Sequence, residues 1–309
     1  IYAFEIFNFK ILFFKYFKKI LMHFLYKIPG YILLLFGGFC LSWGGLIIRQ
    51  FHVAGAWEIL LLRSFFFLVA LIIFLLSTYK GNTFKIILDS GLPAVTGGFL
   101  LSLSFVSYTF AILSTSVANV VFIISTQTIF LAVLGYFFLK EKISLIGFVS
   151  IILAMVGITI MVGDSITTGS LFGNIIALAI PINFSILVVI IRKYPKLDMV
   201  PAIFYAGIFA CIYGLLLSDS LSFTNHDILM GFALGVPQLA FGFICITIGS
   251  KTTKAVTVGV LMLSETIFAP VWVWLFLNEI PPLSVFIGGF IIIFAVFIKS
   301  FDKNKPPTT

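Results

Sequence analysis

The chain has 309 residues, of which 61% are hydrophobic and only 10% are charged. Together with a mean hydropathy of +1.22, this composition excludes a soluble globular domain, whose surface needs many more polar side chains. The net charge of +8 is spread over many connecting segments rather than gathered in one, so we expect contact with anionic lipid headgroups and no binding of nucleic acid.

Apolar runs of about 20 residues, the length that a helix needs to cross a bilayer, follow one another along the chain. Helices are required because the hydrocarbon offers no water to unpaired backbone groups. We therefore predict an all-α integral membrane protein with ten transmembrane helices at 30–48, 57–78, 92–113, 116–139, 144–163, 171–191, 200–218, 229–250, 255–277 and 282–299.

The segment 1–29 precedes the first predicted span and alternates Phe and Ile with Lys. This pattern is typical of a basic amphipathic helix that lies on the cytoplasmic leaflet. An equally good interpretation is that residues 1–21 do not belong to the native protein, because Met22 stands eight residues before the first span. At the other end, 301–309 is predicted to be a cytoplasmic tail.

Positive charge alternates from one connection to the next. Seventeen of the 19 Lys and Arg lie before the first predicted span, at or beyond the end of the last one, or in every second loop between them. Short cytoplasmic loops are enriched in Lys and Arg, so the alternation gives each span an orientation. We expect a multi-pass protein of the bacterial inner membrane with both termini in the cytoplasm.

The two halves of the sequence resemble each other. A shift of 138 residues places 126–141 on 264–279 with seven identities, which include Glu141 on Glu279. A shift of 143 residues places 47–49 on 190–192, both Ile-Ile-Arg.

We therefore predict two repeats of five helices, at 30–163 and 170–300. Because five is an odd number, the second repeat enters the membrane in the opposite sense to the first. Inverted repeats of this kind are typical of secondary transporters, which bind substrate near the midplane between the two halves.

The chain resembles the EamA-type carriers of the drug/metabolite transporter superfamily. The resemblance is strongest in the fourth and ninth predicted spans and the turns that follow them, at 116–119, 139–143, 264–266, 269–272 and 277–280. It implies a ten-helix permease or exporter of small metabolites that works by alternating access. It leaves the substrate open, because the superfamily transports many.

Two ionisable residues lie deep inside predicted spans, where a charge is costly unless it is paired or hydrated. Glu265 is about ten residues into the ninth span, near the midplane at roughly 1.5 Å per residue. It would suit proton coupling or a cationic substrate, or it is a structural residue bonded between helices. Arg63 in the second span would suit a substrate carboxylate, or it pairs with Glu58 or extends toward the outer interface.

Residue type and depth within a span point to further candidates. Gln127 is the repeat partner of Glu265, and Ser104 is a further candidate in the third span. The full set of substrate-binding or coupling candidates is Glu265, Gln127, Arg63, Asn119, Thr126, Ser264, Gln238, Asn183, Trp43 and Tyr108. Proline within a span permits bending, so Pro181, Pro237 and Pro270 are gating candidates, although kinks also occur in immobile helices.

The leading hypothesis is a secondary transporter of a small molecule such as an amino acid or an amine, either coupled to protons or facilitative. The chain contains no ATP-binding loop, and we predict no cofactor. The three histidines, His23, His52 and His226, are dispersed in the sequence, so we predict no metal site. A non-transporting scaffold is an alternative, and an intramembrane enzyme is the least favoured one. A monomer and a homodimer are both open.

Overall fold

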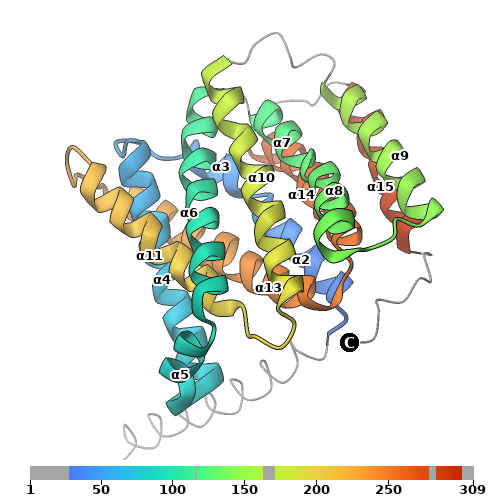
Figure 1. Cartoon of the computed structure of the whole chain (residues 1–309). Coiled ribbons are helices and arrows are strands. Elements are labelled where there is room, and N and C mark those ends of the chain that lie inside the picture. The colour runs from blue at the N-terminus through green and yellow to red at the C-terminus, as the bar shows by residue number, and fades with distance from the viewer. Residues whose placement is uncertain (1–27, 116, 163–170, 278–282, 301–309) are drawn as a thin grey trace, which may run out of the picture.

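A computed structural model describes residues 28–115, 117–162, 171–277 and 283–300. Most of the predicted N-terminal segment 1–29, the tail 301–309 and the repeat partner Glu279 lie outside these ranges. The described residues are helical apart from short connections (Figure 1). The predicted all-α class is therefore confirmed for this part of the chain.

The helices begin and end close to the residues that the apolar runs predict. In chain order they are α2 (Gly30–Leu41), α3 (Gly44–Ile48), α4 (Ala56–Tyr79), η1 (Lys80–Asn82), α5 (Thr83–Asp89), α6 (Gly91–Ser114), α7 (Val117–Ser125), α8 (Gln127–Leu139), α9 (Leu145–Val162), α10 (Leu171–Lys193), α11 (Val200–Leu217), α12 (Asn225–Ala233), η2 (Leu234–Ala240), α13 (Phe241–Thr252), α14 (Ala255–Leu277) and α15 (Leu283–Ser300).

Seven helical segments of the described residues are long and apolar enough to cross a membrane: Gly30–Ile48, Ala56–Asp89, Gly91–Ser114, Phe172–Lys193, Val200–Leu217, Asn225–Thr252 and Ala255–Phe276. Three further apolar helices, at Ile123–Leu139, Leu145–Gly157 and Phe286–Ala295, are shorter. The chain is thus a multi-pass protein by length and composition, and the count of ten crossings stays a prediction.

Three predicted spans are not continuous α-helices. The first is interrupted at Ser42 and Trp43, and the fourth at Thr126. In both interruptions a hydroxyl group bonds to the carbonyl three residues earlier, Ser42 Oγ to Phe39 O and Thr126 Oγ1 to Ile123 O, each at 2.6 Å. Such local bonds compete with the helical ladder. The eighth predicted span contains a π-helix, η2, around Pro237.

The connection predicted at 79–91 is also not an open loop. The chain turns at Lys80, whose φ is +51°, and then forms η1 and the short helix α5 before α6 begins. Phe84 and Leu88 of α5 are exposed, at 72% and 59% of their surface. A short helix with exposed apolar side chains fits the interface of a bilayer, where those side chains reach lipid.

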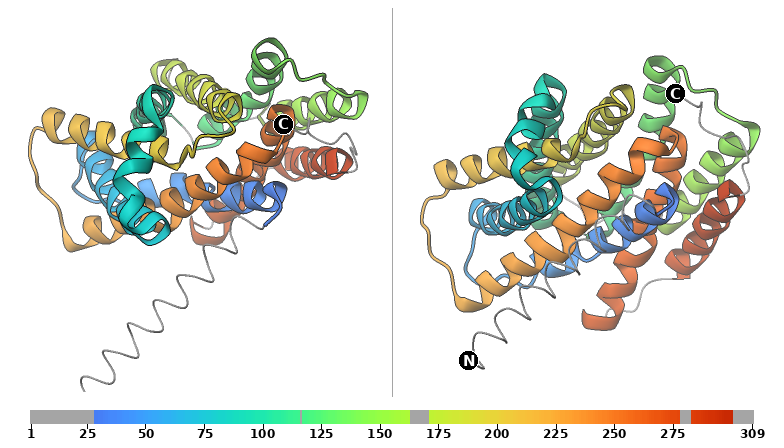
Figure 2. Two further views of the ribbon diagram at one scale, coloured as in Figure 1. Left: turned by 60° about the horizontal axis from the view of Figure 1, so that its bottom comes forward. Right: turned by 90° about the horizontal axis from the view of Figure 1, so that it is seen from below.

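The helices form one bundle in which distant parts of the sequence lie side by side. α6 packs against α10 and α11, α4 packs against α11 and η2, α2 packs against α13 and α14, and α9 and α15 pair at one edge (Figures 1 and 2). The crossing of η2 over α4 is close, because a Cβ atom at Gly235 would lie 2.5 Å from Arg63 O. This contact fixes the backbone of Arg63 against η2.

Candidate functional site

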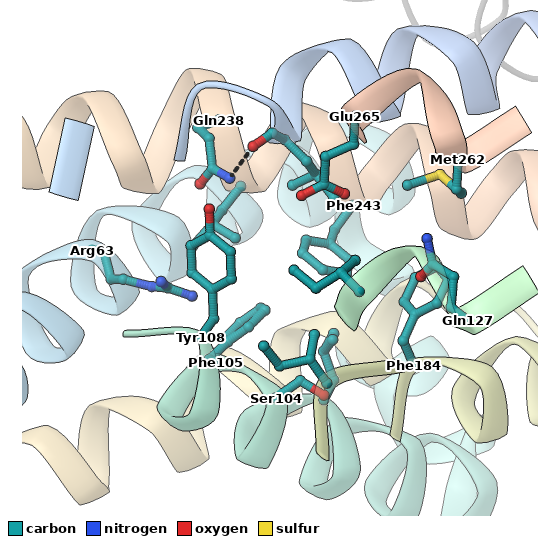
Figure 3. Close-up of a pocket in the computed structure, with 15 residues that line it drawn as sticks. Arg63, Ser104, Phe105, Tyr108, Gln127, Phe184, Gln238, Phe243, Met262 and Glu265 are labelled. Atoms are coloured by element: carbon teal, nitrogen blue, oxygen red, sulfur yellow. Dashed lines mark hydrogen bonds between the residues drawn. The ribbon is translucent and has the colours of Figure 1, made fainter. Parts of the chain in front are cut away.

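A cavity lies inside the bundle, lined by residues of α2, α4, α6, α7, α8, α10, η2, α13 and α14 (Figure 3). The volume that the centres of water molecules can occupy is about 50 Å³, so in this conformation the cavity admits a small solute or a few waters. Its polar lining residues are Arg63, Ser104, Tyr108, Gln127, Gln238 and Glu265. Five of these six belong to the predicted candidate set, and Ser104 was the further candidate.

Arg63 is buried, with 1% of its surface exposed, although it carries a guanidinium group. It donates from Nη1 to Thr109 Oγ1 at 3.2 Å, and its Cζ lies 5.0 Å from the centroid of the Phe105 ring and 5.6 Å from that of Tyr108. Its Nε is buried without a partner. The alternatives of a pair with Glu58 or an extension to the interface are therefore wrong. Arg63 is held by one hydroxyl and two aromatic rings, and no carboxylate among the described residues pairs with it.

Glu265 and Gln127 face the cavity from α14 and α8, and Arg63 lies on the opposite side from Gln127 (Figure 3). Glu265 is 6% exposed and Gln127 is 3% exposed. The described residues give the side chain of neither one a hydrogen bond or an ion pair. The cavity therefore holds one acidic and one basic side chain, and neither forms an ion pair within the described protein.

Tyr108 and Gln238 are neighbours near Arg63 (Figure 3). Gln238 Nε2 donates to Leu41 O at 3.1 Å, a carbonyl that the break between α2 and α3 leaves outside the helical ladder. Its Oε1 is buried without a partner. A Cβ atom at Gly44 would lie 2.6 Å from the Tyr108 hydroxyl and 2.9 Å from Gln238 Nε2. Gly44 thus leaves room for both polar groups.

The apolar wall was not predicted. It includes Phe105, Phe184, Phe243 and Met262, and Phe105 and Phe243 are in edge-to-face contact with their centroids 5.3 Å apart. The chain contains 38 Phe, so residue type alone does not identify those that face a cavity. A helical-face argument would have found Phe105, because Leu101, Ser104, Phe105 and Tyr108 share one face of α6.

Three other predicted candidates, Ser264, Thr126 and Asn183, do not line this cavity. Ser264 donates to Leu35 O at 3.4 Å, which places it at the contact of α14 with α2. Thr126 bonds to the backbone at its helix break, and Asn183 is half-buried on α10. Asn119 lies in α7, and its side chain is not described.

Trp43 lines a separate, larger groove of about 630 Å³ with Phe36, Phe39, Phe241 and Phe276, and Gln238 lines both hollows. Its ring stacks on that of Trp272 with the centroids 3.9 Å apart, and Trp272 Nε1 donates to Ser42 Oγ at 2.7 Å. Trp43 therefore joins the break between α2 and α3 to α14.

The three prolines differ in their effect on the backbone. Pro237 is exposed and lies in η2, so this proline coincides with an irregular segment. Pro181 is buried within α10, which runs without a break from Leu171 to Lys193. α14 is likewise unbroken across Pro270. A role of these prolines in gating stays a prediction.

Two of the histidines are not dispersed in space. The rings of His52 and His226 stack with their centroids 4.2 Å apart, and the backbone N–H of His52 donates to Asp227 Oδ1 at 2.8 Å. The part of the chain that the structure describes contains no group of three or more His, Cys, Asp or Glu placed to hold a metal ion.

The chain is similar to known proteins in sequence and in fold. The model of the EamA-like transporter family matches it twice, at residues 28–163 and 171–301. A Clostridium kluyveri protein described as an uncharacterized transporter is 29% identical over 230 residues, which are 70% of this chain and 74% of that protein. A solved crystal structure shares the fold with a TM-score of 0.73 at 14% identity, over 88% of this chain and 96% of that one.

The family and the relative agree in indicating a membrane transporter rather than an enzyme. Since the two family matches together cover most of its length, the chain belongs to the EamA-like transporter family.

Proposed function

We propose that this protein is a secondary transporter that carries a small zwitterion or amine, such as an amino acid, through the central cavity. The observation that supports this is a buried acid and a buried base without an ion pair, Glu265 and Arg63, on the lining of one cavity. Ionising a buried group without a partner costs several kcal/mol, so a ligand that brings an opposite charge to each of the two would be favoured. A zwitterion supplies both an ammonium for Glu265 and a carboxylate for Arg63.

The walls of the cavity fit the rest of such a solute. Phe105, Phe184 and Phe243 offer apolar contact area, while the Gln238 Oε1 acceptor has no partner within the described protein. Binding sites for small molecules combine apolar walls with a few polar groups that fix orientation, and this cavity has both. Arg63 would bind a carboxylate with two parallel N–H donors, which selects for a planar anion.

Alternating access is the proposed mechanism. In this scheme the halves 30–163 and 170–300 form two inverted repeats of five helices, both termini lie in the cytoplasm, and the halves rock around the cavity. The tandem match to the family model supports two repeats. The cavity is lined by one chain, so the scheme holds for a monomer or a homodimer in the bacterial inner membrane.

Proton coupling is the proposed role of Glu265 beyond substrate contact. A carboxylate that binds either a proton or an ammonium can exchange one for the other, and this exchange would couple their movements. Facilitated transport without protons remains the alternative, and a pH gradient across the membrane separates the two.

The test begins with a thermal-shift screen of amino acids and amines on the purified protein, because a ligand that binds the native state raises its melting temperature. Ligands that stabilise the protein are then followed, as labelled compounds, into proteoliposomes. We expect saturable uptake that Arg63→Gln and Glu265→Gln each lower by about tenfold or more. Glu58→Gln, the same type of change outside the cavity, is the control and should transport normally. No stabilisation and no flux across both classes of compound would overturn the proposal.

A further inference from the structure

A second arginine and a second glutamate, Arg192 and Glu141, form a pair at one end of the bundle, outside the cavity lining. Arg192 Nε donates to Glu141 Oε1 at 2.7 Å, and Nη2 of the same guanidinium forms an ion pair with that oxygen. The two side chains are 10% and 4% exposed. This end carries Lys140, Lys193 and Lys254 beside the pair, and we call it the basic face.

Both members of the pair form further hydrogen bonds to backbone groups. Arg192 Nη1 also donates to the carbonyls of Ser250 and Thr253, and Glu141 Oε2 accepts the backbone N–H of Ala255 at 2.9 Å. These bonds join the basic-face ends of α8, α10, α13 and α14. The first of these helices belongs to the first repeat, and the other three belong to the second.

The same four helices carry the part of the cavity that faces this end. Gln127 is on α8, Phe184 on α10, Phe243 on α13 and Met262 on α14. Met262 lies seven residues after Ala255, which corresponds to about 10 Å of helix. Val258 lies between them on the same face of α14 and is fully buried. A solute that left the cavity toward the basic face would have to separate these helix ends.

We propose that the Glu141–Arg192 pair is a latch that closes the cavity toward the basic face and opens during the transport cycle. This inference rests on the proposed carrier function, but its test needs no substrate. An ion pair suits a latch because removing either partner leaves a buried charge without compensation, so the closed state is stable only while both are in place. The carbonyls of Ser250 and Thr253 make the closed position of Arg192 specific.

The test measures the accessibility of cysteines placed on the two sides of the cavity, in a chain whose native cysteines Cys40, Cys211 and Cys245 are replaced by alanine. Val258→Cys reports on the path between the cavity and the latch. Ala177→Cys reports on the packed core beyond the cavity, fifteen residues before Arg192 on α10, at a distance of about 22 Å along the helix. Each is labelled with a charged maleimide, which reacts only with a thiol that water reaches.

We expect Glu141→Gln and Arg192→Gln to raise the labelling rate of Val258→Cys about tenfold or more, since they shift the population toward the open latch. Labelling of Ala177→Cys, which lies outside the cavity lining, should not rise. Arg192→Lys, which keeps the charge but loses the forked donors, should lie between the wild type and Arg192→Gln. It also provides a milder variant should the others not fold.

Arg49→Gln is the matched control, because Arg49 donates to Thr115 O at 3.1 Å at the opposite end of the bundle. It should leave Val258→Cys shielded. If the latch variants raise labelling at both reporters, the pair only stabilises the fold, and if neither reporter changes, the pair gates nothing. Either result overturns the latch and leaves the transport assay unaffected. Absent flux with a selective rise at Val258→Cys would instead count against the carrier function alone.

Discussion

Two sets of one arginine and one glutamate lie inside this protein, and they differ in what faces the charges. Arg192 and Glu141 contact each other and share further bonds with three backbone groups. Arg63 and Glu265 are equally buried, but they line a cavity and have no ion pair within the described protein. We call Arg192 and Glu141 the complete set, because each has its ion-pair partner and further hydrogen bonds within the protein. We call Arg63 and Glu265 the incomplete set, because they have no ion pair in the described structure and can contact a solute in the cavity. The comparison indicates that the complete set stabilises the closed bundle, while the incomplete set is placed to contact a substrate.

The largest effect is expected from removing one partner of the complete set. Glu141→Ala leaves the Arg192 guanidinium buried without its carboxylate, which should lower the free energy of unfolding by roughly 3–5 kcal/mol. Thermal or denaturant unfolding in detergent measures this. Glu58→Ala removes a buried carboxylate that has no ion pair in the described structure, and it should cost less than about 1 kcal/mol. Equal losses in the two variants would contradict the comparison.

The second prediction concerns Arg63, where we expect transport to fall without a loss of stability. Arg63→Met replaces an incompletely bonded cation by an apolar side chain of similar length, so the melting temperature should stay the same or rise. Transport should nevertheless fall by about 10- to 100-fold, the range expected for a lost charge-assisted hydrogen bond to substrate. Unfolding and proteoliposome flux are measured on one preparation. A large drop in stability with residual flux in proportion to folded protein would show that Arg63 is structural.

The third prediction tests whether Glu265, the acidic member of the incomplete set, couples transport to protons. The substitution is Glu265→Gln. The amide is similar in size but cannot bind or release a proton, so a pH gradient that drives uptake in the wild type should lose its effect. We expect about a tenfold loss of gradient-driven flux with little change in stability, since the carboxylate has no bonds to lose in the described structure. Wild-type flux that ignores the gradient would remove proton coupling from the mechanism.

The smallest effect concerns the space around the incomplete set. Gly44→Ala would place a methyl group 2.6 Å from the Tyr108 hydroxyl, which must move and narrow the cavity. We expect a stability loss of about 1 kcal/mol and a several-fold weaker apparent substrate affinity. Gly81→Ala is the control, because a Cβ atom there meets nothing within 4 Å. A fully normal Gly44→Ala transporter would show that Tyr108 does not need its present position.

Much of the fold was predictable because membrane helices depend on a property that the sequence carries locally, namely runs of apolar residues. The breaks at Ser42 and Thr126 were not, because they depend on a hydroxyl that competes with the helix and on tertiary bonds such as that of Gln238 to Leu41 O. The helix α5 was missed because its seven residues are too few to show a period.

The site was predictable only where a polar residue stands out against its apolar surroundings. Arg63, Gln127 and Glu265 were found in this way, since each is conspicuous within a hydrophobic run. The contacts were not found, because partners such as Glu141 and Arg192 are 51 residues apart and nothing local joins them. The same reason explains why the stacking of His52 on His226 was unexpected.

The bond from Gln238 to Leu41 O has a practical consequence for experiments on this family member. The amide both faces the cavity and substitutes for the missing rung of an interrupted helix in the other half of the chain. An inactive variant at position 238 therefore does not by itself identify a ligand contact, since the same change deforms α2. Only a comparison of ligand affinity with the geometry of that helix separates the two causes.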